Sequence, residues 1–67
     1  MIIADALAFE MPFGKHKGST LRHIAETECL YLDWLLGIDL HGELHEAVRL
    51  VADEYADEID VKLMERT

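Results

Sequence analysis

The feature that most constrains the fold of this chain is a turn signal within the segment MPFGKHKGST. Two glycines, Gly14 and Gly18, enclose three cationic or ionisable residues, Lys15, His16 and Lys17. Because glycine adopts backbone dihedral angles that other residues resist, the two glycines predict the ends of a tight reversal. Such a turn would hold the two lysines at an exposed tip.

The residues before this turn have the pattern of a β-strand. The large apolar side chains of Leu7, Phe9, Met11 and Phe13 alternate with smaller or polar residues, which is typical of a strand with one buried face. Pro12 cannot donate a backbone hydrogen bond, so the strand would lie at a sheet edge or end there. Residues 1–6 would either extend the strand or form a loose arm.

The residues after the turn are compatible with two structures. Ser19 and Thr20 could begin a short return strand, which would complete a β-hairpin. Alternatively, Thr20 could cap a helical turn over residues 21–25, with Leu21 and Ile24 facing inward at a spacing of three. The sequence does not decide between them.

Two helices are predicted in the rest of the chain. The first would span residues 28–36, with Thr27 as its N-cap and Gly37 as a left-handed stop. The second would be long, spanning residues 40–63, because apolar residues recur there every three or four positions. The predicted fold class is therefore α+β: a hairpin over 7–20 packed on a short helix and a long amphipathic helix.

Size and composition predict a single small domain over residues 1–67, with a thin core. Cys29 is the only cysteine, so no intrachain disulfide and no paired-cysteine metal site can form. The N-terminal residues lack the pattern of a signal peptide, and no apolar run approaches the roughly 20 residues of a membrane span. A cytoplasmic protein is expected.

Charge is distributed unevenly along the sequence. The net charge is −8, yet residues 11–25 carry Lys15, Lys17 and Arg22 without an acidic residue, so the remainder carries −8 − 3 = −11. This balance argues against a protein that binds duplex DNA over its whole surface. A local contact with nucleic acid or phosphate through these three residues and His16 remains compatible with it. The alternative is a solvated turn whose lysines protect an edge strand from aggregation.

Other candidate sites carry less information. His41 and His45 are four residues apart and could provide two ligands of a metal site, with His16 or His23 as a third, or could be two exposed helical histidines. They lack the order of a catalytic zinc motif, and no metal site, cofactor or catalytic centre is predicted.

Tyr31 and Trp34 could be stacking platforms for bases, or core residues that anchor their helix. Cys29 has no apparent base partner and is not predicted to be a nucleophile.

An acidic group of residues provides a second candidate surface. It is either a solubilising helix face or a docking face for a basic protein partner, and it comprises Asp53, Glu54, Asp57 and Glu58.

Several residues at consistent spacing resemble a known family. The pattern F-G-K-x-K-G followed by Y-L-x-W-L resembles the C-terminal domain of bacterial exodeoxyribonuclease X-like proteins over roughly residues 9–50. It is also similar to small stand-alone bacterial and phage proteins classed as quorum-sensing-regulated virulence factors. The matching positions are Phe13, Gly14, Lys15, Lys17, Gly18, Tyr31, Trp34 and Leu35.

The resemblance implies an accessory module that travels with nucleic-acid enzymes. It does not imply nuclease activity, because the exonuclease carboxylates of those proteins lie in a different domain. We therefore expect a non-catalytic module of a bacterial or phage DNA-processing system that contacts the nucleic-acid backbone through residues 14–18. The alternative is an acidic protein-binding regulator or inhibitor, acting as a monomer or a homodimer through its C-terminal helix.

Overall fold

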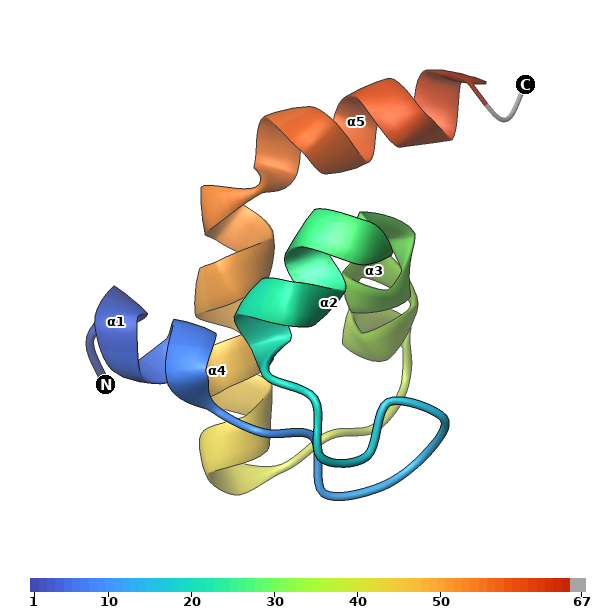
Figure 1. The fold of residues 1–67 in the computed structure, drawn as a ribbon. Coiled ribbons are helices and arrows are strands. Elements are labelled where there is room, and N and C mark those ends of the chain that lie inside the picture. The colour runs from blue at the N-terminus through green and yellow to red at the C-terminus, as the bar shows by residue number, and fades with distance from the viewer. Residues whose placement is uncertain (66–67) are drawn as a thin grey trace.

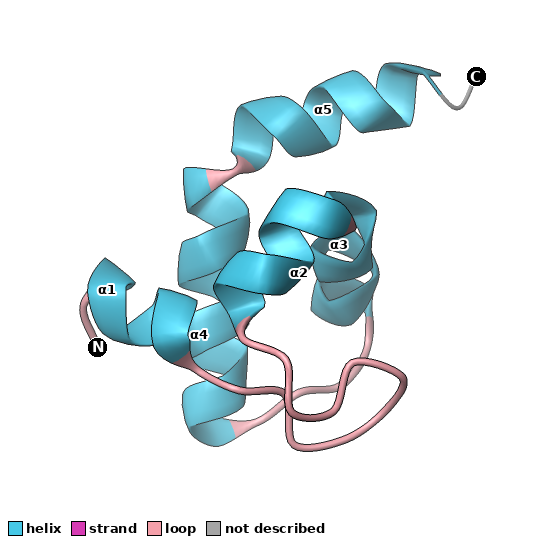
Figure 2. Cartoon of the chain, in the orientation of Figure 1, coloured by secondary structure: helices cyan, strands magenta, loops and turns pink. Residues whose placement is uncertain are grey.

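The computed structural model describes residues 1–65 (Figures 1 and 2). These residues form helices, with one long loop between the first helix and the second. The predicted α+β fold with a β-hairpin over 7–20 is therefore wrong, since the described residues contain no sheet. The helices are α1 (Ile3–Ala8), α2 (Leu21–Thr27), α3 (Cys29–Gly37), α4 (Gly42–Glu54) and α5 (Ala56–Glu65).

Helix α1 takes the place of the predicted arm and of the first part of the predicted strand. Its sequence, IADALA, is rich in alanine, the residue with the highest helix propensity. Ala6 is fully buried, and α1 packs against α4 and α2. Because Leu7 belongs to this helix, the apolar alternation that suggested a strand does not describe one continuous element.

The segment between α1 and α2 is a loop tied by a few backbone hydrogen bonds. Met11 N–H donates to Ser19 O, and Met11 O accepts from Gly18 N–H, both at 2.9 Å. A single isolated antiparallel bridge joins Glu10 to Thr20. Pairing does not extend into a ladder because Ser19 N–H donates to His16 O within the turn instead of to Met11 O. The buried Met11 side chain, only 1% exposed, anchors the loop to the core.

Helix α2 resolves the two alternatives left open for residues 19–25. Thr20 is the N-cap, and its side-chain oxygen accepts a hydrogen bond from His23 N–H at 3.2 Å. Leu21 and Ile24 are fully buried, so the capped helix is confirmed and the return strand is wrong. The helix continues to Thr27, whose hydroxyl donates to His23 O at 2.7 Å.

A sharp corner at Glu28 separates α2 from α3. Glu28 has φ −150° and ψ 66° and is the N-cap of α3, so the prediction of Thr27 in that position is wrong. Gly37 is the last residue of α3 and does not have a positive φ, so the left-handed stop predicted there is also wrong.

Helix α4 is the central element, in contact with α1, α2, α3 and α5. The long helix predicted over 40–63 is broken at Tyr55, and α5 turns away to pack against α3 (Figure 1). Because of this break, Ile59 is buried and only 6% of its surface is exposed. Packing in the tertiary structure thus outweighs the helix propensity of residues 43–63, which contain neither glycine nor proline.

The core is small and takes residues from the loop and from all five helices. Its fully buried large side chains come from the loop, α2, α3 and α4: Met11, Leu21, Ile24, Leu32, Leu35, Val48 and Val51. Among residues 1–65, no helix combines the length and apolar character that crossing a bilayer would require.

Candidate functional site

The glycine-bounded turn predicted from the sequence forms as two overlapping reverse turns. Gly14 O accepts from Lys17 N–H at 3.1 Å, and His16 O accepts from Ser19 N–H at 2.9 Å. Gly14 and Gly18 have φ of +82° and +88°, which L side chains rarely adopt. We call residues 14–18 the cationic turn.

Glu28, at the corner between α2 and α3, holds this turn in place. One oxygen of its carboxylate lies 3.0 Å from Lys15 Nζ, and the other oxygen contacts His16 Nε2. The hydrogen bond from Lys15, and after it the one with His16, lowers the pKa of the Glu28 carboxyl below its ordinary value of 4.5. The carboxylate therefore offsets part of the positive charge that the sequence places here.

Tyr31, on the first turns of α3, packs against the cationic turn. Lys15 Nζ lies 5.4 Å from the centre of the Tyr31 ring, and the His16 ring meets it edge-on at 4.5 Å. A Cβ atom added at Gly14 would lie only 3.1 Å from the Tyr31 hydroxyl oxygen. The glycine therefore allows both the backbone conformation and the close approach of the tyrosine.

Trp34 extends this packing along α3. Its ring centre is 5.3 Å from that of Tyr31, with the ring planes tilted by 33°. The Trp34 side chain is 54% exposed, so the hypothesis that it is a core residue is wrong. Leu35 faces the core instead and is fully buried. We call His16, Tyr31 and Trp34 the aromatic row.

The residues predicted to contact phosphate divide into two pairs. Lys15 and His16 are engaged by Glu28, as described above. Lys17 and Arg22 are exposed and form no ion pair with any residue in the range 1–65. Arg22 lies at the start of α2, beside a hollow that is also lined by residues of α1. Two cations thus remain available to a ligand.

Phe13, the first residue of the family pattern, precedes the cationic turn and is 42% exposed. It therefore adds an apolar side chain to the surface of the same loop.

The acidic residues do not share one helix face. Asp53 and Glu54 end α4, whereas Asp57 and Glu58 begin α5, on the other side of the break at Tyr55. All four side chains are exposed. We call these four residues the acidic corner.

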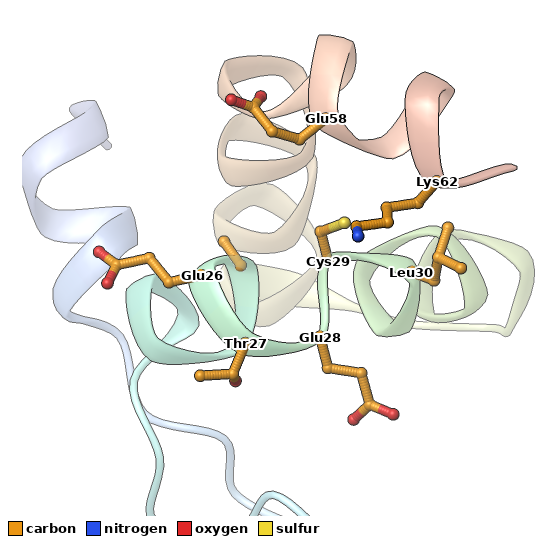
Figure 3. A pocket seen from close by; sticks show the side chains of 8 residues that line it. Glu26, Thr27, Glu28, Cys29, Leu30, Glu58 and Lys62 are labelled. Carbon is orange, nitrogen blue, oxygen red and sulfur yellow. The ribbon is translucent and has the colours of Figure 1, made fainter. Parts of the chain in front are cut away.

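A shallow hollow of about 390 Å³ lies between the α2–α3 corner and α5 (Figure 3). Cys29 and Lys62 line it, and Cys29 is 8% exposed. Glu28 also lines this hollow, but Figure 3 shows its side chain directed away from α5, and its carboxylate contacts Lys15 of the cationic turn.

The histidines considered as metal ligands are separated by the start of α4. His41 is the extended N-cap of α4, and its Nε2 lies 3.4 Å from Asp39 Oδ2. His45 is an exposed residue within the helix. Within residues 1–65, no three His, Cys, Asp or Glu side chains are grouped so that they could hold a metal ion.

The cationic turn, Glu28, Tyr31 and Trp34 all belong to one continuous stretch of sequence that a family model recognises. Residues 11–37 match the exodeoxyribonuclease X-like C-terminal family. The predicted resemblance to the exodeoxyribonuclease X-like C-terminal domain is thereby confirmed, over a range shorter than the expected 9–50, whereas the similarity to the virulence-factor proteins stays a prediction.

The exodeoxyribonuclease X-like match covers less than half of the chain, namely the loop from Met11, α2 and α3. It associates this part of the molecule with proteins that act on nucleic acid. No curated protein and no solved structure matches the chain.

Glu28 is the site residue that sequence reasoning missed. It lies 13 residues after Lys15, in a stretch interpreted as the first turn of a helix. Its role depends on the corner between α2 and α3, which brings its side chain back to the turn. No spacing rule along a single helix or strand would have indicated this contact.

Proposed function

We propose that the chain is a non-catalytic accessory module of a nucleic-acid-processing system and that it contacts the nucleic-acid backbone through the cationic turn and Arg22. The observation that carries this proposal is the coincidence of two features. The exodeoxyribonuclease X-like match covers residues 11–37, and the same segment presents Lys17 and Arg22 as exposed, unpaired cations within the described chain.

The chemistry of the turn suits a phosphate group. Lysine offers a compact positive charge, and arginine can donate two parallel hydrogen bonds to phosphate oxygens. Because Glu28 already engages Lys15, and because the whole chain carries −8, the contact is expected to be weak. It should also be salt-dependent, with log K falling by about 0.7 per contacted phosphate for each unit of log salt on a single strand.

The test is fluorescence anisotropy with a labelled oligonucleotide at several salt concentrations. The double substitution Lys17→Glu and Arg22→Glu should abolish binding. Its matched control is Arg49→Glu with Lys62→Glu, on α4 and α5, because both pairs change the net charge from −8 to −8 − 4 = −12. Equal loss of binding in both double variants would show an effect of overall charge and would contradict the proposal.

The acidic corner supports a second candidate function, the binding of a basic protein partner. Its four exposed carboxylates form no ion pair with another residue of the range 1–65, so their charge is available. Reversal of Asp53, Glu54 and Asp57 to lysine should then abolish capture of the partner, while leaving oligonucleotide binding unchanged or stronger. Retention of the partner by this triple variant would exclude this candidate.

A further inference from the structure

We propose that the aromatic row is a stacking site for a base of a single-stranded nucleic acid, with Trp34 as the residue that the base contacts. This inference rests on the proposed function and adds the class of ligand, namely a single strand with at least one unpaired base. The charged groups of the cationic turn would bind the phosphates next to that base.

The Trp34 indole is accessible to a ligand. Tyrosine and tryptophan are enriched at interfaces because they combine a large apolar surface with a polar group, so an exposed indole next to a second aromatic ring is suited to a partner. Trp34 is 54% exposed, although Leu32 and Leu35 of the same helix are completely buried. One side of the indole has Tyr31 as its neighbour, and the exposed remainder is available to a flat ligand.

The aromatic row also lies close to the cationic turn. Lys15 marks the distance, although it is paired with Glu28, and Lys17 of the same turn, unpaired within residues 1–65, is the expected phosphate contact. Lys15 Nζ is 5.4 Å from the Tyr31 ring centre, which is 5.3 Å from that of Trp34. Lys15 Nζ and the Trp34 ring can therefore be no farther apart than the sum of these distances, about 11 Å. Stacked nucleotides on one strand rise by about 3.4 Å each, so two to four of them cover this span.

The aromatic row is fixed by contacts with the cationic turn. Tyr31 is held by the His16 ring at 4.5 Å and by the close approach of Gly14. His16 is in turn held by Glu28. Because Trp34 stands on a helix beside this fixed tyrosine, a base would bind with little ordering of the protein, which favours affinity.

The combination of aromatic rings and nearby cations distinguishes a single strand from a duplex. Proteins that bind single strands place bases on aromatic side chains and track the backbone with positive charge. In a duplex the base faces are already stacked on one another and are not available to an indole. The strongly acidic remainder of the chain also disfavours the broad backbone contact of a duplex binder.

The experiment uses Trp34 itself as the probe, because it is the only tryptophan. The protein is titrated with a thymidine oligonucleotide and with an abasic oligonucleotide of the same length, which retains the phosphates but has no bases. The thymidine strand should quench the indole fluorescence and bind more tightly, whereas the abasic strand should cause little quenching. A duplex of the same length should behave like the abasic strand.

A substitution separates stacking from phosphate contact. With a labelled thymidine strand, Trp34→Ala should weaken binding by about 5- to 150-fold, the range expected for loss of one base–aromatic stack. Leu36→Ala removes another exposed apolar side chain of α3 and should leave affinity unchanged. Circular dichroism would establish that both variants remain folded, and Trp34→Phe should retain part of the affinity.

The outcomes distinguish this inference from the proposed function. Equal affinity for thymidine and abasic strands, with no effect of Trp34→Ala, would overturn the stacking site. If the Lys17 and Arg22 reversals still abolished binding in that case, the phosphate contact would stand. The absence of binding to every strand would overturn both.

Discussion

The packing of the cationic turn against Tyr31 can be tested with one pair of glycine substitutions. Gly14 and Gly18 have nearly the same φ, +82° and +88°. A Cβ at Gly14 would lie 3.1 Å from the Tyr31 hydroxyl, whereas a Cβ at Gly18 would meet no atom within 4 Å. Gly18→Ala therefore measures the backbone effect alone, and Gly14→Ala measures the backbone effect together with the contact.

The expected magnitudes follow from this geometry. Placing alanine in a left-handed conformation costs about 1–2 kcal/mol of folding free energy. Replacing glycine by alanine also lowers the entropy of the unfolded chain, and this offsets about 0.4–1 kcal/mol of that cost. Gly18→Ala should thus lower the free energy of unfolding by about 1 kcal/mol. Gly14→Ala should lower it by about 1 kcal/mol more, the lower end of the cost of overpacking, because Tyr31 must move.

Urea denaturation of a double-mutant cycle provides the measurement. Tyr31→Phe removes the hydroxyl oxygen that the new Cβ would approach. It should therefore recover most of the excess cost of Gly14→Ala, giving a coupling free energy of about 1 kcal/mol. Equal costs for the two glycine substitutions, together with no coupling to Tyr31→Phe, would refute the packing of the turn on α3.

Three further predictions concern stability. Leu35→Ala should lower the free energy of unfolding by about 2–5 kcal/mol because Leu35 is fully buried, whereas Leu36→Ala, at a 41% exposed neighbour, should change it by about 0.5 kcal/mol or less in urea denaturation. Thr20→Ala removes the cap of α2 and should cost about 1 kcal/mol by the same measurement; a change indistinguishable from zero would argue against the cap. Because Lys15 and His16 lower the pKa of Glu28, its carboxylate stabilises the fold above pH 4.5, and this contribution is lost as the pH falls through the lower native-state pKa. Acid titration followed by circular dichroism should accordingly show weaker acid destabilisation in Glu28→Gln than in the unsubstituted chain, and identical profiles would contradict this role.

The helices of the middle of the chain were largely predictable from local signals. Thr20 stands directly before a helix with Leu21 and Ile24 three residues apart, and this pattern agrees with the observed cap and buried face. The helix predicted over 28–36 overlaps α3, Cys29–Gly37, because its leucine-rich sequence has no competing turn signal before Gly37. Glycines 14 and 18 likewise indicated the turn that they form.

The errors arose where tertiary packing decides between local alternatives. The alternation from Leu7 to Phe13 crosses a helix end and a loop. The alanine-rich sequence of α1 and the burial of Ala6 against α4 together favour the helix in its first part. The break at Tyr55 is also set by packing, since α5 must turn to bury Ile59. One signal could have indicated it: Asp57 and Glu58 are favourable at a helix N-terminus, where α5 begins.

The candidate site was predicted in its residues but not in its arrangement. The sequence identified Lys15, Lys17 and Trp34, and a basic segment on an acidic chain. It did not indicate that Glu28 would engage Lys15, or that Trp34 would be exposed beside Tyr31. Both facts depend on the corner at Glu28, which is a non-helical residue within an otherwise helical stretch.

The most direct test of the central claim, that the cationic turn and the aromatic row form the binding surface, is a nitrogen–proton correlation spectrum of the labelled protein titrated with a thymidine oligonucleotide. The structure predicts chemical-shift changes in the amides of residues 14–18 and in the Trp34 indole N–H, with unchanged signals at the acidic corner. Changes confined to the acidic corner, or no changes at all at saturating oligonucleotide, would contradict it.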